Sequence, residues 1–197
     1  GQRKPRSGDV RVHGAPYKAS RREAQTQSVR CIPEEPLRNA CAPRMSVAEN
    51  LAFRSFDRNG ISRPKRWLDM GAMARDARRL IDAYRIKAAS PDIAVSSLSG
   101  GNVQRTVLAR ELSDAVDLLI VSNPCFGLDF SAVGDIRGQI LAARNAGAAV
   151  LLVSEDLDEL LELSDRILVM SEGRIVYETP IDQADIPTIG NYMAGHH

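Results

Sequence analysis

The strongest chemical pattern in this sequence is a serine followed by two glycines at the start of a helical repeat. Ser99, Gly100 and Gly101 precede an apolar stripe at helical spacing, formed by Val103, Val107, Leu108 and Leu112. A serine caps free amides, glycine lets an anion approach the backbone, and the helix dipole favours negative charge at this end. The stretch predicts a phosphate site in principle, although Ser-Gly-Gly before a helix is, taken alone, more typical of an ordinary cap.

Two further polar clusters follow apolar runs of strand length. The run 115–121 ends at Ser122 and Asn123, and the run 148–153 ends at Ser154 and Glu155. Continuous apolar runs of this length are typical of buried parallel strands.

Composition excludes several broad classes. The 197 residues suffice for one domain with a real core, and a net charge of +1 gives no global attraction to nucleic acid or membrane. Residues 1–44 hold ten Lys/Arg against four Asp/Glu, which we interpret as a solvated face. The three cysteines lack metal-ligand spacing and fit a reduced compartment. No apolar run approaches membrane-spanning length, so any membrane role must come through a partner.

The elements that position these residues alternate between strands and helices. Residues 8–18 predict a short hairpin, and Ser28–Ile32 a strand that ends in the loop Pro33–Pro36. Ser46 and Glu49 form a capping box, and 72–86 is amphipathic with Met73, Ala77 and Leu80 on one face. Further helices are expected at 131–144, 156–163 and 182–194, with a hairpin at 167–177. The pattern predicts an α/β fold with a mainly parallel sheet, an N-terminal antiparallel hairpin and a helical subdomain.

The run from Leu98 to Asn102 resembles the signature sequence of ATP-binding-cassette (ABC) ATPases, in the form seen in sugar and nucleoside importers. The resemblance extends from about Pro5 to about Gly195 and implies the core of a P-loop nucleoside triphosphatase. It divides the chain into partial antiparallel strands and a Q-loop region at 1–45, a helical subdomain at 46–98, and the rest of the core at 99–197. No G-x-x-x-x-G-K-[ST] P-loop occurs in these residues, so we expect a truncated core.

The resemblance also assigns roles to individual positions. Nucleotide contacts are implied at the signature, at the D-loop and at the Q-loop, that is, at Ser99, Gly100, Gly101, Asn102, Gln104, Asp129 and Glu34. In active members an Asp-Glu pair stands where this chain has Ser122 and Asn123, and a histidine stands where it has Glu155. We therefore expect no catalytic residue, no metal ligand and a degenerate site of the chain's own.

The implied function is a partial ATP-binding subunit of a nucleoside or sugar importer, resembling the second, C-terminal half of such proteins. Its signature would close over ATP and Mg²⁺ held with a second ATP-binding domain, while transmembrane permease subunits would hold it at the cytoplasmic face of the membrane. Alone, the chain is expected to bind ATP weakly or not at all and to be inactive. Nucleic acid binding and direct membrane insertion are not expected. The alternatives are a non-transport ABC ATPase and a non-enzymatic interaction module that retains the fold.

Overall fold

The computed structural model describes residues 5–56, 62–63 and 67–195 of the chain. The fold divides into two compact units, Gly1–Leu151 and Leu152–His197, which are described separately below. Among the described residues no helix combines the length and the apolar character needed to cross a membrane.

The first unit is built on a three-stranded sheet. Its strands are β3 (Val29–Ile32), β6 (Leu118–Ser122) and β7 (Ala149–Val153), in the order β3-β6-β7, and β7 runs across the border of the two units. β3 and β6 are parallel, with Val29 opposite Leu118. Ile32, Leu119 and Val121 are completely buried, as the apolar runs predict. The expectation of full burial is wrong for β7, because Leu151 and Val153 are half exposed and only alternate residues pack inward.

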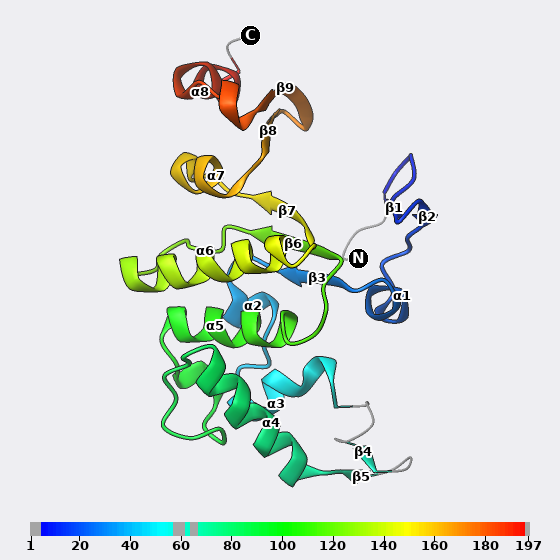
Figure 1. Cartoon of the computed structure of the whole chain (residues 1–197), viewed down its shortest axis with the longest axis vertical. Helices are drawn as coiled ribbons and strands as arrows, with labels where there is room; N and C mark the ends of the chain where they lie inside the picture. The colour runs from blue at the N-terminus through cyan, green and yellow to red at the C-terminus, as the bar shows by residue number, and fades with distance from the viewer. Residues whose placement is uncertain (1–4, 57–61, 64–66, 196–197) are drawn as a thin grey trace. The chain divides into compact units, whose positions relative to one another are not determined.

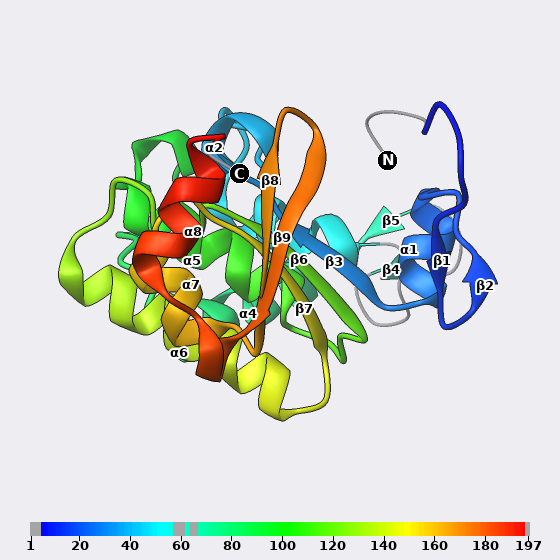
Figure 2. The ribbon, with the colours of Figure 1, turned by 90° about the horizontal axis from the view of Figure 1, so that it is seen from above.

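The predicted N-terminal hairpin is present. β1 (Arg11–Val12) and β2 (Ala15–Pro16) pair antiparallel, and Gly14 in the turn adopts a positive φ of 74°. The hairpin lies near α1 (Arg21–Thr26) in the part of the chain that leads into β3 (Figure 2). A capping box between Ser20 and Glu23 starts α1, an element absent from the sequence prediction although its Ser-x-x-Glu signal is present.

Among the described residues, four helical elements follow β3 up to Ala83. They are α2 (Pro36–Asn39), α3 (Val47–Leu51), the 3₁₀ turn η1 (Ala52–Arg54) and α4 (Met70–Ala83). The predicted capping box of Ser46 and Glu49 is confirmed at the start of α3. The expected connector 57–70 lies partly outside the described residues, and its described part includes the antiparallel strands β4 (Ser62–Arg63) and β5 (Trp67–Leu68). Buried residues of α3, α4 and α5, together with Ile86, form one apolar cluster: Val47, Ala48, Leu51, Ala77, Leu80, Ile86 and Ala109.

The helix that follows the Ser-Gly-Gly stretch, α5 (Gly100–Glu111), is buried along most of its length after the short 3₁₀ turn η2 (Val95–Ser97). It lies between α4 and α6 (Phe130–Asn145), as Figure 1 shows. Its end is fixed by charge: Glu111, with no exposed surface, pairs with Arg54 at 2.9 Å and with Arg110 at 2.8 Å. Removing one partner of such a buried pair would leave an uncompensated charge at the C-terminal end of α5.

The second unit consists of α7 (Leu157–Leu163), the hairpin β8 (Arg166–Ser171) and β9 (Arg174–Pro180), the turn η3 (Ile181–Gln183) and α8 (Ile186–Met193). The hairpin is confirmed, and its turn residues Glu172 and Gly173 both have positive φ. The predicted terminal helix 182–194 is shorter in the structure, because α8 begins at Ile186, where Asp185 is the N-cap and accepts a hydrogen bond from the N–H of Thr188. Ile167, Val169 and Ile189 form the core of this unit, and the rings of Tyr177 and Tyr192 stack at 4.5 Å.

Candidate functional site

The first turn of α5 has no side-chain cap. Ser99 occupies the N-cap position with extended backbone angles, as predicted, but its side chain makes no capping hydrogen bond. Its Oγ instead accepts a hydrogen bond from Nδ2 of Asn102 at 2.8 Å. The sequence expectation that Ser99 caps the helix is therefore wrong in its detail. Ser99 and Gly100 are exposed, so the first amides of α5 stay available to an anion.

Asn102 fixes the shape of this turn. Its side chain is 8% exposed, and its Oδ1 accepts a hydrogen bond from the backbone N–H of Lys87 at 2.7 Å. The amide group of Asn102 thus joins the segment after α4 to Ser99 on the opposite side. Since a buried amide that lost these partners would carry its desolvation cost, this residue holds the turn in one conformation.

The two glycines differ in what surrounds them. A Cβ on Gly101 would lie 3.3 Å from the Cβ of Ala132 on α6, whereas a Cβ on Gly100 would meet Leu128 at 3.8 Å, an ordinary contact. Gly101 is thus explained by the close approach of two helices, and Gly100 is the glycine whose open face suits a ligand. Asp129 has a structural role, since its Oδ1 accepts from the N–H of Ala132 at 2.9 Å and caps α6.

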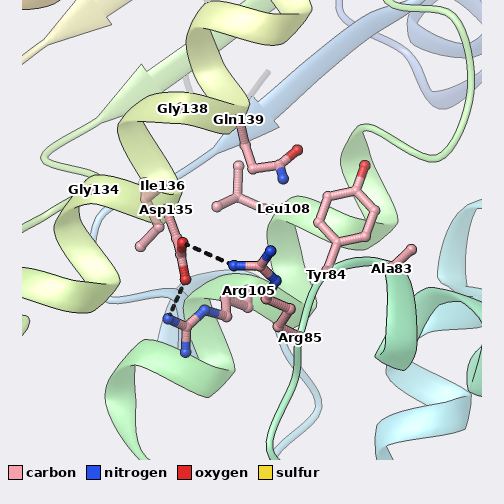
Figure 3. Close-up of a pocket in the computed structure, with 10 residues that line it drawn as sticks. All are labelled: Ala83, Tyr84, Arg85, Arg105, Leu108, Gly134, Asp135, Ile136, Gly138 and Gln139. Carbon is pink, nitrogen blue, oxygen red and sulfur yellow. Dashed lines mark hydrogen bonds and ion pairs between the residues drawn. The ribbon is translucent and has the colours of Figure 1, made fainter.

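An ion-pair cluster holds α5 against α6. Arg105 donates to Asp135 at 2.7 Å, and Arg85 approaches the same carboxylate at 3.9 Å (Figure 3). The cluster lines a cavity of about 290 Å³ that also receives Tyr84, whose pKa burial raises above its ordinary value, so that the phenol stays protonated. The sequence analysis missed these residues, because Arg105 and Asp135 are 30 positions apart and no local pattern joins them.

At the end of β6 the structure brings together two of the predicted positions. Nδ2 of Asn123 donates to Oε2 of the Glu34 carboxylate at 3.3 Å. Asn123 has a positive φ of 42°, a conformation that asparagine tolerates better than most residues. Ser122, the last residue of β6, is uncharged, so Glu34 is the only one of these three residues with a carboxylate.

The donor set at this point does not suit a divalent ion. Mg²⁺ is held by carboxylates and phosphate oxygens in octahedral geometry, and a single exposed glutamate does not provide this. Within the described ranges no group of three or more His, Cys, Asp or Glu side chains is close enough to hold a metal. The first turn of α5, by contrast, has an uncapped helix N-terminus with exposed small residues, Ser99 and Gly100, which suit one face of a nucleotide phosphate.

The remaining predicted positions lie elsewhere. Glu155 is in the second unit, exposed in the turn between β7 and α7, where Ser154 donates to the buried Glu159 at 2.7 Å. Gln104 is on α5, 3% exposed and turned into the protein rather than to the surface. Phe126 and Phe130, at 80% and 96% exposure, flank Asp129 and were missed, although two phenylalanines around a Gly-Leu-Asp turn are visible in the sequence.

Comparison with known proteins decides the family. Residues 1–125 match the sequence profile of the ABC transporter family. The chain belongs to the ABC transporter family. This agrees with the resemblance of the Leu98–Asn102 run and with the order of strands and helices around it.

Relatives in this family include import proteins. The chain is 40% identical to the glucose import ATP-binding protein TsgD13 of Haloferax volcanii over 99% of its length, and 32% identical to the guanosine import ATP-binding protein NupO of Bacillus subtilis, also over 99%. A nucleoside import ATP-binding protein of Lactococcus lactis is 38% identical over 86% of the chain. The chain spans only 36%, 38% and 33% of the length of these three relatives, in the same order.

Solved structures of ABC cassettes share the fold. An ATP-binding subunit of an ABC transporter matches with a TM-score of 0.74 at 18% identity, covering 98% of this chain and 79% of that one. An ATP-binding cassette solved as a dimer in a post-hydrolysis state with ADP and Pi matches with a TM-score of 0.70 at 17% identity, covering 91% and 76%. The expected ABC ATPase fold, with its parallel sheet and antiparallel hairpin, is thereby confirmed.

Proposed function

We propose that this chain is part of the ATP-binding subunit of an importer for nucleosides or sugars. Support comes from its family and from the import proteins that it resembles at 32–40% identity along most of its length. These relatives favour transport over a non-transport role in the family. The proposed location is the cytoplasmic face of the membrane, where permease subunits would hold the chain in place.

The proposed role of the chain's own residues is to complete an ATP site in trans. Ser99, Gly100 and Asn102 would present the first turn of α5 to the γ-phosphate of ATP bound by the P-loop of a second ATP-binding domain. The supporting observation is that this turn is exposed, free of a side-chain cap, and fixed from behind by the contact of Asn102 with Lys87. Gln104 would act only indirectly, since it is buried on the helix.

The chain's own nucleotide position is proposed to be degenerate. ATP bound with Mg²⁺ supplies the phosphoryl group in such sites, and the protein must orient water and neutralise charge. Neither Ser122 nor Asn123 can accept a proton or hold a metal firmly, and Glu155 places a negative charge where a histidine is typical of the family. Asp129 is proposed to support the trans site through the D-loop, in addition to its cap on α6.

Substitution at Ser99 in the full-length protein tests this proposal. Ser99→Glu places a carboxylate against the γ-phosphate, so we expect ATP hydrolysis by the assembled transporter to fall by roughly 10²-fold or more. Ser96→Glu is the matched control, because Ser96 is exposed three residues earlier and outside the first turn of α5. The control should hydrolyse ATP within about twofold of the parent. Normal hydrolysis by Ser99→Glu would remove the trans assignment.

A non-enzymatic module that retains the ABC fold remains a second candidate. It is favoured by the uncharged pair at Ser122 and Asn123, which gives this chain no acid–base or metal chemistry of its own. The Ser99→Glu experiment separates the two candidates, because a module without a trans site would leave hydrolysis by the assembly unchanged.

A further inference from the structure

A short chain of hydrogen bonds at the start of α5 has a fixed direction. It begins at the backbone N of Lys87, whose N–H can only donate and which lies 2.7 Å from Oδ1 of Asn102. Oδ1 is therefore the accepting end of this amide, and Nδ2 is the end that faces Ser99. Because Nδ2 carries only donors, Oγ of Ser99, at 2.8 Å, must accept its hydrogen bond.

The Ser99 hydroxyl is left with a hydrogen bond to donate. A serine hydroxyl has one O–H donor and two lone pairs, and Asn102 uses one lone pair. Ser99 is exposed, and no acceptor for its O–H lies among the residues that the structure describes. This direction favours a ligand that offers an acceptor oxygen.

A second N-cap serine in the chain shows what a carboxylate does at the same place. Ser20 starts α1, and the residue three positions later is Glu23 rather than an asparagine. There the Ser20 hydroxyl donates to Oε2 of Glu23 at 3.0 Å, so its O–H is used within the protein. The amide of Asn102 does the opposite, since it donates to the serine and leaves the O–H of Ser99 for a ligand.

Asn102 is 8% exposed, so it acts from behind the turn rather than by touching a ligand. We propose that Asn102 is a positioning residue that holds the Ser99 hydroxyl as a hydrogen-bond donor to an oxygen of the γ-phosphate. The inference rests on the proposed function and deepens it, because it names the atom of this chain that faces the phosphate and the group that directs it. Phosphate oxygens accept hydrogen bonds, so a hydroxyl held in this direction suits them.

A double-mutant cycle in the full-length, assembled transporter tests the role of Asn102. Ser99→Ala removes the hydroxyl, and Asn102→Asp keeps an acceptor for the N–H of Lys87. The new carboxylate should accept from the Ser99 hydroxyl, as Glu23 accepts from Ser20. Each change should lower kcat for ATP hydrolysis roughly 10-fold or more, the loss expected of one hydrogen bond to a charged group. The KM for ATP should stay within about threefold, because the P-loop of the second domain holds the nucleotide.

The double variant separates the hydrogen bond from simple charge repulsion. Without the hydroxyl, Asn102→Asp has no hydrogen bond to redirect, so the double variant should keep kcat within about threefold of Ser99→Ala. A further fall of roughly 10-fold would show that the carboxylate acts by repelling the phosphate, and would overturn the proposal. Unchanged kcat in Asn102→Asp alone would overturn it as well.

Variants of Ser99 alone test the donor without altering the residues behind the turn. Ser99→Thr keeps a hydroxyl and Ser99→Val has a methyl group in its place, so the threonine variant should have the higher kcat by roughly 10-fold. Equal turnover of the two variants would exclude a donor role for Ser99. The Ser99→Glu experiment tells two kinds of failure apart. Normal hydrolysis by Ser99→Glu removes the trans site itself, whereas its loss of hydrolysis together with additive effects in the cycle removes only the role of Asn102.

Discussion

Asn123 and Glu34, 89 positions apart, meet through a hydrogen bond of 3.3 Å between the asparagine amide and the glutamate carboxylate. Asn123 is one of the positions proposed to be degenerate and Glu34 is the proposed Q-loop residue, so two proposed site positions are in contact. An amide next to a carboxylate satisfies it, whereas a second carboxylate there would repel it. A carboxylate introduced at position 123 would therefore stand against the carboxylate of Glu34.

Restoring the acidic pair is accordingly expected to change little. In the full-length protein, Ser122→Asp combined with Asn123→Glu should alter ATP turnover only modestly, because the new carboxylate at 123 would face Glu34 and because Glu155 remains unchanged. Asn123→Gln alone should leave turnover near that of the parent, since it keeps the amide. Steady-state ATP hydrolysis measures both variants. Loss of most activity in Asn123→Gln would mean that ATP is hydrolysed at this chain's own nucleotide position.

The isolated chain is expected to bind Mg-ATP weakly or not at all. P-loop amides and the P-loop lysine supply most phosphate contacts in such proteins, and these 197 residues contain no such motif. Isothermal titration calorimetry on the monomeric chain measures this directly. Micromolar affinity would contradict the proposed division of roles, and the Ser99→Glu variant would show whether that binding uses the first turn of α5.

The exposed pair of Glu35 and Arg38 is expected to affect assembly rather than folding. Their side chains are 58% and 82% exposed, so Glu35→Lys or Arg38→Glu should change stability by no more than about 0.5 kcal/mol. If permease subunits dock on this loop, either reversal should reduce co-purification with them. Glu178→Lys is the control, because Glu178 forms a similarly exposed pair with Arg166 in the β8–β9 hairpin. Unchanged co-purification of the loop variants would refute docking at this loop.

Asn102 offers a test of how the signature turn is held. Asn102→Ala leaves the N–H of Lys87 without its acceptor in a partly buried place, which should destabilise the fold by about 1–3 kcal/mol. Asn102→Asp keeps an acceptor for that N–H, and the Ser99 hydroxyl can donate to it, so its loss should be smaller. Urea denaturation with a two-state fit gives both values. Equal losses in the two variants would mean that the contact with Lys87 contributes little.

The close approach of Gly101 to Ala132 predicts that a smaller residue at 132 compensates for a larger one at 101. Gly101→Val should force α5 away from α6 and cost about 1–3 kcal/mol, as overpacking does in close contacts. Gly100→Val meets only Leu128 at 3.8 Å and should cost less, which makes it the matched control. Ala132→Gly should recover part of the loss in Gly101→Val but not in Gly100→Val. Additive effects in this double-mutant cycle would show that the two positions do not interact.

Local signals predicted local structure well. The capping box of Ser46 and Glu49 could be predicted because it lies within four consecutive residues. The apolar run around Leu119 predicted a buried strand because that signal, too, is contained in a few consecutive residues. The same Ser-x-x-Glu signal occurs at Ser20, where no strong apolar stripe follows it, and α1 contains no buried residue.

What the sequence did not yield depends on pairs that are distant along the chain. The link between Arg105 and Asp135, the contact of Asn123 with Glu34, and the approach of Gly101 to Ala132 need the tertiary fold before they can be seen. The side chain of Ser99 shows the same limit on a smaller scale. The N-cap position of Ser99 was predictable from the sequence. Its hydrogen bond with Asn102 was not, because the N–H of Lys87 holds the Asn102 side chain in place.

The absence of a side chain at Gly101 determines how substitutions on α5 affect α6. Ala132 leaves no room for a side chain at Gly101 and also donates the N–H that Asp129 accepts, so one residue of α6 contacts both the first turn of α5 and the residue that caps α6. Random substitutions in either segment should therefore produce correlated defects in both. A suppressor screen starting from a damaged residue 101 would be expected to return changes on α6, far away in sequence and adjacent in space.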